Sequence, residues 1–361
     1  METSQITEHK PMFEAMMARK LDRFYPEAEL YVKAKVAAEI NRLKIERNAV
    51  ILGHNYMEAA LFQTIPDIVG DSLELSRRAA KTEKDIIVFC GVRFMAETAK
   101  ILNPSKTVLI PARKAGCSLA ESITAADVRA LKAMYPGVPV VTYINTYADV
   151  KAETDICCTS GNAVEVVNSL NSERIIFLPD QYLAANIARE TGRKIIFPSK
   201  TPVSAEKQAE NPNMDWQFLG WRGACEVHER FTVQDIKNVR ADWPDVVVLA
   251  HPECPPDVVE ASDYSGSTTQ MIKYVEQTKA PRYLLLTECS MGDNVAAANP
   301  EKEMLRLCSI RCPHMAEITL EDTLAALQKT QFVITVPEEI RARAFNAVDR
   351  MIKIGGLGKR D

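Results

Sequence analysis

The sequence predicts an α/β protein built from three small, pseudo-symmetric, three-layer α/β/α domains with parallel sheets around one central site. Short apolar runs alternate with amphipathic segments of helical period, a pattern typical of parallel α/β units. The same order of segments occurs three times along the chain, and each repeat ends in a cysteine-containing segment followed by a helix start. An internal repeat of this kind indicates related structural units.

The length supports this division. A chain of 361 residues is too long for one ordinary hydrophobic core. Its 47% apolar and 25% charged residues are typical of a soluble globular protein. We expect an N-terminal helical segment, three α/β domains of about 100 residues each, and a C-terminal helix with a tail, at residues 1–40, 41–130, 131–241, 242–336 and 337–361.

Charge and hydropathy exclude several classes of function. The net charge of −4 gives no basic surface for nucleic acid. No apolar run approaches the roughly 20 residues that span a bilayer, so no membrane association is expected. The opening METSQITEHK lacks the apolar core of a secretory signal, which favours the cytoplasm. In that reducing compartment the nine cysteines are more consistent with buried thiols, metal ligands or redox switches than with disulfides.

The first repeat sets the pattern for the other two. A helical stretch with one interrupting proline, Pro26, precedes it over residues 12–47. Strands then alternate with helices that begin at polar residues. The expected strands are residues 49–56, 85–91 and 107–111, and the expected helices are residues 71–80 and 93–102.

The later chain repeats these features. Its strands at residues 139–146 and 246–253 also end in polar residues, and a small-residue turn opens the next helix in every repeat. Residues 200–216 resemble a polar loop insertion, and residues 336–356 a final helix with a glycine stop. The corresponding cysteine segments are AGCSLAESIT, GACEVHERFT and IRCPHMAEIT.

Polar residues at the strand ends point to a shared binding site. In an open parallel sheet, ligands bind at the carboxyl ends of the strands. Small-residue turns at helix starts add hydroxyl and N–H groups that suit phosphate or carboxylate. Three sheets with these edges facing inward would therefore line one cavity. The strand-end candidates are His54, Asn55, Tyr56, Tyr143, Asn145, His251 and Glu253, and the helix-start candidates are Ser72, Ser160, Ser267 and Thr268.

The count of equivalent cysteines is informative. Cys117, Cys225 and Cys312 provide three thiols, whereas a closed structural zinc site takes four ligands and a four-iron cluster usually takes four cysteines. Three would leave one iron open as a Lewis acid, as a dehydration requires. His228 lies three residues after Cys225, but neither parallel segment has a histidine at that spacing. We therefore interpret His228 as a substrate-facing residue and not as half of a zinc pair.

Several long motifs resemble quinolinate synthase, and the resemblance extends from about residue 40 to residue 340. The motifs are GHNYMEAALFQTIPDIVGDSLELS, GVRFMAETAKILNPSKTVLIP, YINTYADVKAETDICCTSGNAV, LPDQYLAANIA, GACEVHERF, HPECPPDVVEASDYSGSTTQMI and TECSMGDN.

The resemblance implies condensation of iminoaspartate with dihydroxyacetone phosphate to quinolinate, a precursor of NAD, with release of phosphate and two waters. It implies one 4Fe–4S cluster per chain, held by Cys117, Cys225 and Cys312 with one iron open to substrate. Cys308 is a rival for the third position, but the RCPHMAEITLE context favours Cys312. L-aspartate oxidase or aspartate dehydrogenase would supply iminoaspartate.

The family's site residues transfer to matching positions of this sequence. Glu253, at a strand end beside His251, is the best candidate base, and Tyr56 and Tyr143 could move protons to or from departing hydroxyls. We expect Tyr56, Tyr143, His251 and Glu253 to be catalytic. The expected substrate contacts are His54, Ser72, Tyr143, Asn145, Ser160, His228, His251, Glu253, Ser267 and Thr268.

Two alternatives remain at this stage. Another open-cluster hydro-lyase, a hydroxy-acid dehydratase, would share the three cysteines but need no phosphate site. A non-catalytic iron–sulfur sensor would tolerate loss of the strand-end Tyr56 and Glu253.

Overall fold

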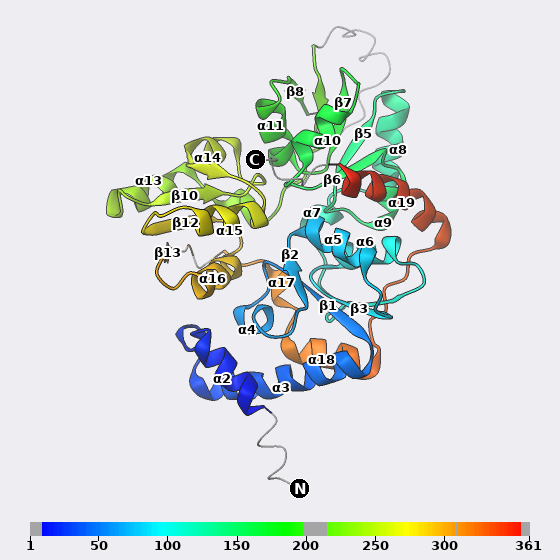
Figure 1. Ribbon diagram of the computed structural model, residues 1–361. Helices are drawn as coiled ribbons and strands as arrows, with labels where there is room; N and C mark the ends of the chain where they lie inside the picture. The colour runs from blue at the N-terminus through cyan, green and yellow to red at the C-terminus, as the bar shows by residue number, and fades with distance from the viewer. Residues whose placement is uncertain (1–8, 198–214, 306, 308–309, 355–361) are drawn as a thin grey trace.

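The computed structural model describes residues 9–197, 215–305, 307 and 310–354. It contains three separate parallel sheets, each flanked by helices, so the expected α/β class is confirmed (Figure 1). Cys308 and most of the expected loop at residues 200–216 lie outside the described residues.

The first sheet has the order β2-β1-β3-β4. Its central strand β1 pairs in parallel with β2 and β3, and every residue of β1 and β3 is buried. Strands covered on both faces need the continuous apolar runs seen in the sequence. The elements are β1 (Ala49–His54), α4 (Ala59–Phe62), β2 (Ile68–Gly70), α5 (Ser72–Lys81), β3 (Ile86–Cys90), α6 (Arg93–Leu102), β4 (Thr107–Leu109) and α7 (Ser118–Glu121).

The second sheet has the order β6-β5-β7-β9-β8, all parallel. It repeats the first arrangement around the central strand β5 and adds a further strand at the far edge. The elements are β5 (Val140–Tyr143), α9 (Ala148–Ala152), β6 (Ile156–Cys158), α10 (Ala163–Ser169), β7 (Ile175–Leu178), α11 (Gln181–Glu190), β8 (Ile195–Ile196), β9 (Phe218–Leu219) and η2 (His228–Arg230).

The third sheet has the order β11-β10-β12-β13 and matches the first sheet strand for strand. The repeat found in the sequence is therefore a repeat of topology. The elements are β10 (Val247–Ala250), α14 (Pro256–Ala261), β11 (Tyr264–Ser265), α15 (Thr268–Gln277), β12 (Arg282–Leu286), α16 (Cys289–Ala298), β13 (Glu303–Leu305) and α17 (Pro313–Ala316).

One further helix follows each cysteine segment, and all three begin in the same way. In each case an N-cap threonine accepts a hydrogen bond from the backbone N–H of an aspartate three residues later. This contact satisfies one of the unpaired N–H groups of the first turn. The Thr-x-x-Asp pattern therefore fixes the starts of α8 (Ala125–Met134), α13 (Val233–Asp242) and α18 (Leu320–Lys329).

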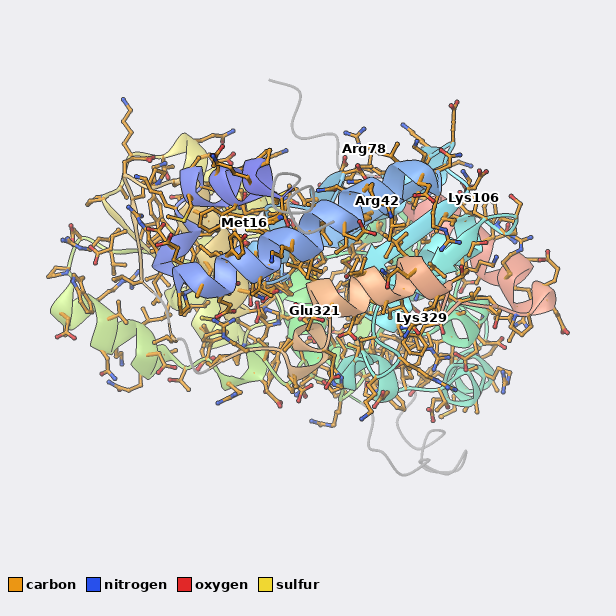
Figure 2. The ribbon with its side chains drawn as sticks, turned by 90° about the horizontal axis from the view of Figure 1, so that it is seen from below. Met16, Arg42, Arg78, Lys106, Glu321 and Lys329 are labelled. Carbon is orange, nitrogen blue, oxygen red and sulfur yellow. The ribbon has the colours of Figure 1, made fainter. Side chains whose placement is uncertain are left out.

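These three helices join the units into a ring, because each packs on the sheet of the next unit. Val128 of α8 lies in the core of the second unit and Ile236 of α13 in that of the third. Leu327 of α18 returns to the core of the first unit, where α18 lies beside α3 (Figure 2). By packing, α8 and α13 thus belong with the unit that follows them in the sequence, and α18 belongs with the first unit.

The terminal helices close the structure. The N-terminal stretch is interrupted near Pro26, the N-cap of α3, as its sequence indicates. The C-terminal helix packs against α9, β6 and α6, so it joins the first and second units. No helix in the described part of the chain is long and apolar enough to cross a membrane. These elements are α2 (Lys10–Ala18), η1 (Leu21–Arg23), α3 (Glu27–Glu46) and α19 (Glu338–Lys353).

Candidate active site

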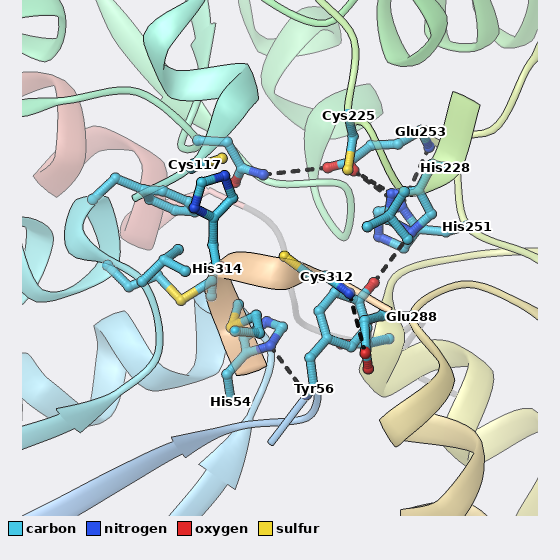
Figure 3. A pocket seen from close by; sticks show the side chains of 18 of the residues that line it. His54, Tyr56, Cys117, Cys225, His228, His251, Glu253, Glu288, Cys312 and His314 are labelled. Atoms are coloured by element: carbon cyan, nitrogen blue, oxygen red, sulfur yellow. Dashed lines mark hydrogen bonds and ion pairs between the residues drawn. The ribbon is translucent and has the colours of Figure 1, made fainter. Parts of the chain in front are cut away.

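One central cavity receives side chains from all three units. Its volume is about 70 Å³, room for several waters. The strand-end candidate Asn55 does not line it, and its amide donates to Oγ1 of Thr268 at 2.9 Å. All residues predicted to be catalytic, to contact substrate or to hold the cluster, except Ser267, line the cavity (Figure 3). They are His54, Tyr56, Ser72, Cys117, Tyr143, Asn145, Ser160, Cys225, His228, His251, Glu253, Thr268 and Cys312.

The central strands of the first and third units end in the same local structure. Nδ1 of His54 accepts the backbone N–H of Tyr56 at 3.2 Å, and Nδ1 of His251 accepts that of Glu253 at 3.3 Å. Burial lowers the pKa of His54 to about 4 and that of His251 to about 3. Both imidazoles are therefore neutral near pH 7, and each presents Nε2 as its remaining polar atom.

Glu253 is the centre of the hydrogen-bonded network. Its Oε2 lies 2.6 Å from Nδ1 of His228, and its Oε1 accepts the amide of Asn145 at 3.3 Å. Burial by itself would raise the pKa of Glu253, but His228, His251 and the Tyr143 hydroxyl outweigh it and lower the pKa to about 2. The carboxylate is therefore ionised although it is only 2% exposed.

The two tyrosines lie on either side of this carboxylate. The Tyr56 hydroxyl is 3.3 Å from Nε2 of His228 and 2.6 Å from Oγ1 of Thr287. Burial, reinforced by the charge of Glu253, raises the pKa of both Tyr56 and Tyr143 well above the usual value. Both phenols are therefore protonated and can donate a proton or a hydrogen bond.

The three cysteines share one backbone geometry. In each segment the carbonyl of the cysteine accepts the N–H of the residue four positions later, at 3.0 to 3.1 Å, which forms a single helical turn. Backbone N–H groups two and three residues after the cysteine point toward each thiol. Such N–H groups favour a thiolate.

Burial nevertheless keeps these thiols protonated in the absence of a cation. It raises the pKa of Cys117 to about 12 and that of Cys312 to about 11, and together with Glu253 it raises the pKa of Cys225 well above the usual value. All three cysteines line the same cavity (Figure 3). Three sulfur donors on one cavity, each facing N–H groups, fit a metal–sulfur group.

A second set of donor atoms overlaps the first. Single ligand atoms of Cys225, His228 and Glu253 all lie within 4.8 Å of one another. These residues are also consistent with a single metal ion.

The helix-start residues divide into two groups. Ser72 and Thr268 occupy the first positions of α5 and α15, and the Ser160 hydroxyl lies 3.2 Å from Nε2 of His251. Ser267 does not line the cavity. Its hydroxyl donates to Asp71 Oδ2 at 3.0 Å and caps α15, so its expected contact with substrate stays a prediction that this geometry does not support.

Sequence reasoning missed four ionisable residues that line the cavity, which are Asp71, Glu226, Glu288 and His314. Glu288, 2% exposed, follows β12, and its carboxylate accepts the backbone N–H groups of Ser290 and Cys312; burial raises its pKa to about 7. Its position directly after a predicted strand is the sequence feature that could have identified Glu288 as a site residue. His314 also lines the cavity and pairs with Glu226 at 3.1 Å.

Comparison with known proteins agrees with this architecture. A family model described as quinolinate synthetase A protein matches residues 38–353. Quinolinate synthase 2 of Mesorhizobium japonicum is 52% identical over 340 residues, which cover 94% of this chain and 98% of that protein. The quinolinate synthase of Agrobacterium fabrum is 50% identical over 340 residues, 94% of this chain and 92% of that protein. That of Xylella fastidiosa is 50% identical over 315 residues, 87% of this chain and 86% of that protein. With matches of this extent, the chain belongs to the quinolinate synthetase A family.

Proposed function

We propose that the chain is a quinolinate synthase that condenses iminoaspartate with dihydroxyacetone phosphate and releases quinolinate, phosphate and two waters, as a step in NAD biosynthesis. The observation that carries the proposal is the meeting of three cysteines, one after each sheet, with Tyr56 and Glu253 on one cavity. Family membership supports the same assignment.

Cys117, Cys225 and Cys312 would hold a 4Fe–4S cluster. The shared turn geometry and the N–H groups at each sulfur support this ligand set. When bound, a cluster with only three protein ligands supplies an open iron, which acts as a Lewis acid toward oxygen groups of the substrate.

The surrounding residues suit the proton transfers of two dehydrations. Glu253 is ionised and accepts a proton, and His228, 2.6 Å away, holds its carboxylate in place. Tyr56 and Tyr143 are protonated and donate to a departing hydroxyl. His251 is neutral, and its Nε2 offers a hydrogen bond beside Ser160.

Anionic substrate groups are held by local donors and not by net charge. Ser72 and Thr268 stand at helix starts, where backbone N–H groups suit phosphate or carboxylate. His54, Asn145 and Ser160 add neutral polar atoms to the same wall. We expect this reaction in the cytoplasm, with L-aspartate oxidase or aspartate dehydrogenase as a nearby supplier of the unstable iminoaspartate.

The test combines cluster content with turnover. Protein purified without oxygen should contain about four irons per chain and form quinolinate when iminoaspartate is generated in the presence of dihydroxyacetone phosphate. Ala at Cys117, Cys225 or Cys312 should abolish iron binding, whereas Cys308→Ala should not.

Three outcomes would contradict the proposal. Iron lost with Cys308→Ala and kept with Cys312→Ala would reassign the third ligand. Turnover of a hydroxy acid without dihydroxyacetone phosphate would favour a hydro-lyase. Full cellular function of Glu253→Gln and Tyr56→Phe with the cluster intact would favour a sensor.

A further inference from the structure

Cys225, His228 and Glu253 form a donor set that differs from the three equivalent cysteines. One sulfur, one imidazole nitrogen and one carboxylate oxygen lie within 4.8 Å of one another. His228 and Glu253 are each only 2% exposed. Zinc is bound by these three atom types, and three protein ligands with a fourth position left for water or substrate are typical of its open sites.

The contact between His228 and Glu253 requires a proton or a metal ion between them. Nε2 of His228 lies 3.0 Å from Oγ1 of Thr287, and when Nε2 carries the proton it donates to that hydroxyl. Nδ1 then presents a lone pair 2.6 Å from the Glu253 carboxylate. Two acceptors at this distance repel each other unless a proton or a metal ion lies between them.

The direction of these atoms supports a shared ligand. Nδ1 of His228 lies close to Oε2 of Glu253. It is nevertheless buried without a hydrogen-bond partner of acceptable geometry among the described residues. Close approach without alignment is expected for two atoms that are both turned toward a third point. The hydroxyls at Nε2 provide the outer support that a metal-bound histidine requires, because they fix its tautomer and ring orientation.

We propose that the chain without its cluster binds one Zn²⁺ through Cys225 Sγ, His228 Nδ1 and Glu253 Oε2. Binding releases the Cys225 thiol proton to solvent, and any proton held between His228 and Glu253 leaves with it. The site does not depend on the proposed cluster. Because both use Cys225, however, Zn²⁺ would compete with cluster assembly, and that consequence alone rests on the proposed function.

Co²⁺ is the spectroscopic probe for the test. The full chain is stripped of iron with a chelator under reducing conditions and titrated with Co²⁺. We expect about one Co²⁺ per chain, a thiolate-to-cobalt charge-transfer band, and displacement by Zn²⁺, which binds more tightly at a given site.

The variants separate the two donor sets. Cys225→Ser, His228→Ala and Glu253→Gln should each weaken Co²⁺ binding by at least about 100-fold, because loss of a merely supporting group already costs roughly 10- to 100-fold. Cys117→Ser and Cys312→Ser are the matched controls, since they remove equivalent thiols outside the set, and should bind Co²⁺ like the wild type. Circular dichroism checks that each variant is folded. If Cys225→Ser is unfolded, Cys225→Ala is used in its place.

Two results would overturn the zinc site. Loss of the band in Cys117→Ser or Cys312→Ser would show a three-thiolate site. Unchanged affinity in His228→Ala and Glu253→Gln, or no binding by the wild type, would exclude the mixed donor set. The titration uses neither iron nor substrate, so failure of the proposed enzyme function would not affect its outcome.

Discussion

The first and third units present the same structure at the cavity but different chemistry. His54 and His251 each accept the backbone N–H of the residue two positions later, and burial lowers the pKa of both. That later residue is Tyr56 in one unit and Glu253 in the other. One is a protonated phenol and the other an ionised carboxylate. The repeat thus fixes where side chains point, while single positions within it have diverged into a proton donor and a proton acceptor.

The second unit shows how the divergent positions are connected. Its strand β5 ends at Tyr143, and Asn145 two residues later donates to Glu253 at 3.3 Å. Equivalent positions of two units therefore contact each other directly across the cavity. His228, from the loop after the second sheet, connects Glu253 to Tyr56. The comparison predicts that substitutions at these positions reduce quinolinate formation unequally, and that substitution of Glu253 reduces it most.

The largest expected effect is that of Glu253→Gln. The amide keeps the shape of the side chain but cannot accept a proton, so quinolinate formation should fall by about 1,000-fold, within the range typical of general acid–base groups. Iron content is measured in the same preparations to separate chemistry from cluster loss. Glu226→Gln, at a cavity carboxylate outside this network, is the control and should lose less than about tenfold. Similar losses in both variants would contradict a special role for Glu253.

A smaller effect is expected for Tyr56→Phe. This change removes the hydroxyl that contacts Thr287 and His228, so the turnover rate should fall by about 100-fold while the ring still packs. Tyr147→Phe is a matched control, because its hydroxyl contacts Glu121 away from the network. If the turnover rate fell as much in Tyr56→Phe as in Glu253→Gln, the expected asymmetry between the two units would be contradicted.

The repeated features are those that the sequence could predict. Cys117, Cys225 and Cys312 recur in matching contexts, and His54 and His251 recur at strand ends, so each copy supports the others. Glu288 has one counterpart, Asp180, which caps α11 but does not line the cavity, and His314 has none. Their places at the cavity therefore depend on the folding of the third unit around it. Likewise, the Thr-x-x-Asp pattern shows where α8, α13 and α18 begin but not that each covers the next unit's sheet, because that choice depends on contacts far apart in the sequence.

The two strand-end histidines should make the metal-free protein sensitive to acid. The folded-state pKa of His54 is about 4, below its unfolded value of about 6.5, so between these values the unfolded chain binds more protons. Stability is therefore fully present above about pH 6.5 and is lost as the pH falls toward 4. Between about pH 7 and pH 5 the loss should be on the order of 2 kcal/mol for each histidine.

Urea unfolding at the two pH values measures this effect. His54→Asn keeps an acceptor for the Tyr56 N–H but does not titrate. Between about pH 7 and pH 5 the free energy of unfolding should therefore fall less in this variant than in the wild type, by a difference on the order of 2 kcal/mol. His251→Asn should behave in the same way. The equivalence of the two units would be broken if only one of the variants changed the pH dependence.

The smallest expected effects come from the serines at helix starts, where the N-cap position and the first helical position have different roles. The Ser267 hydroxyl is engaged by Asp71 and by the cap of α15, so Ser267→Ala should lower the free energy of unfolding by about 1 kcal/mol. KM for dihydroxyacetone phosphate should stay within about twofold, since the hydroxyl does not face the cavity. Ser72 lines the cavity, so Ser72→Ala should instead raise that KM by about tenfold with little change in stability, the loss expected for one hydrogen bond to a charged group. A rise in KM with Ser267→Ala would show that the hydroxyl leaves Asp71 to bind substrate, and the N-cap position of the third unit would then bind anions as well as the first helical position.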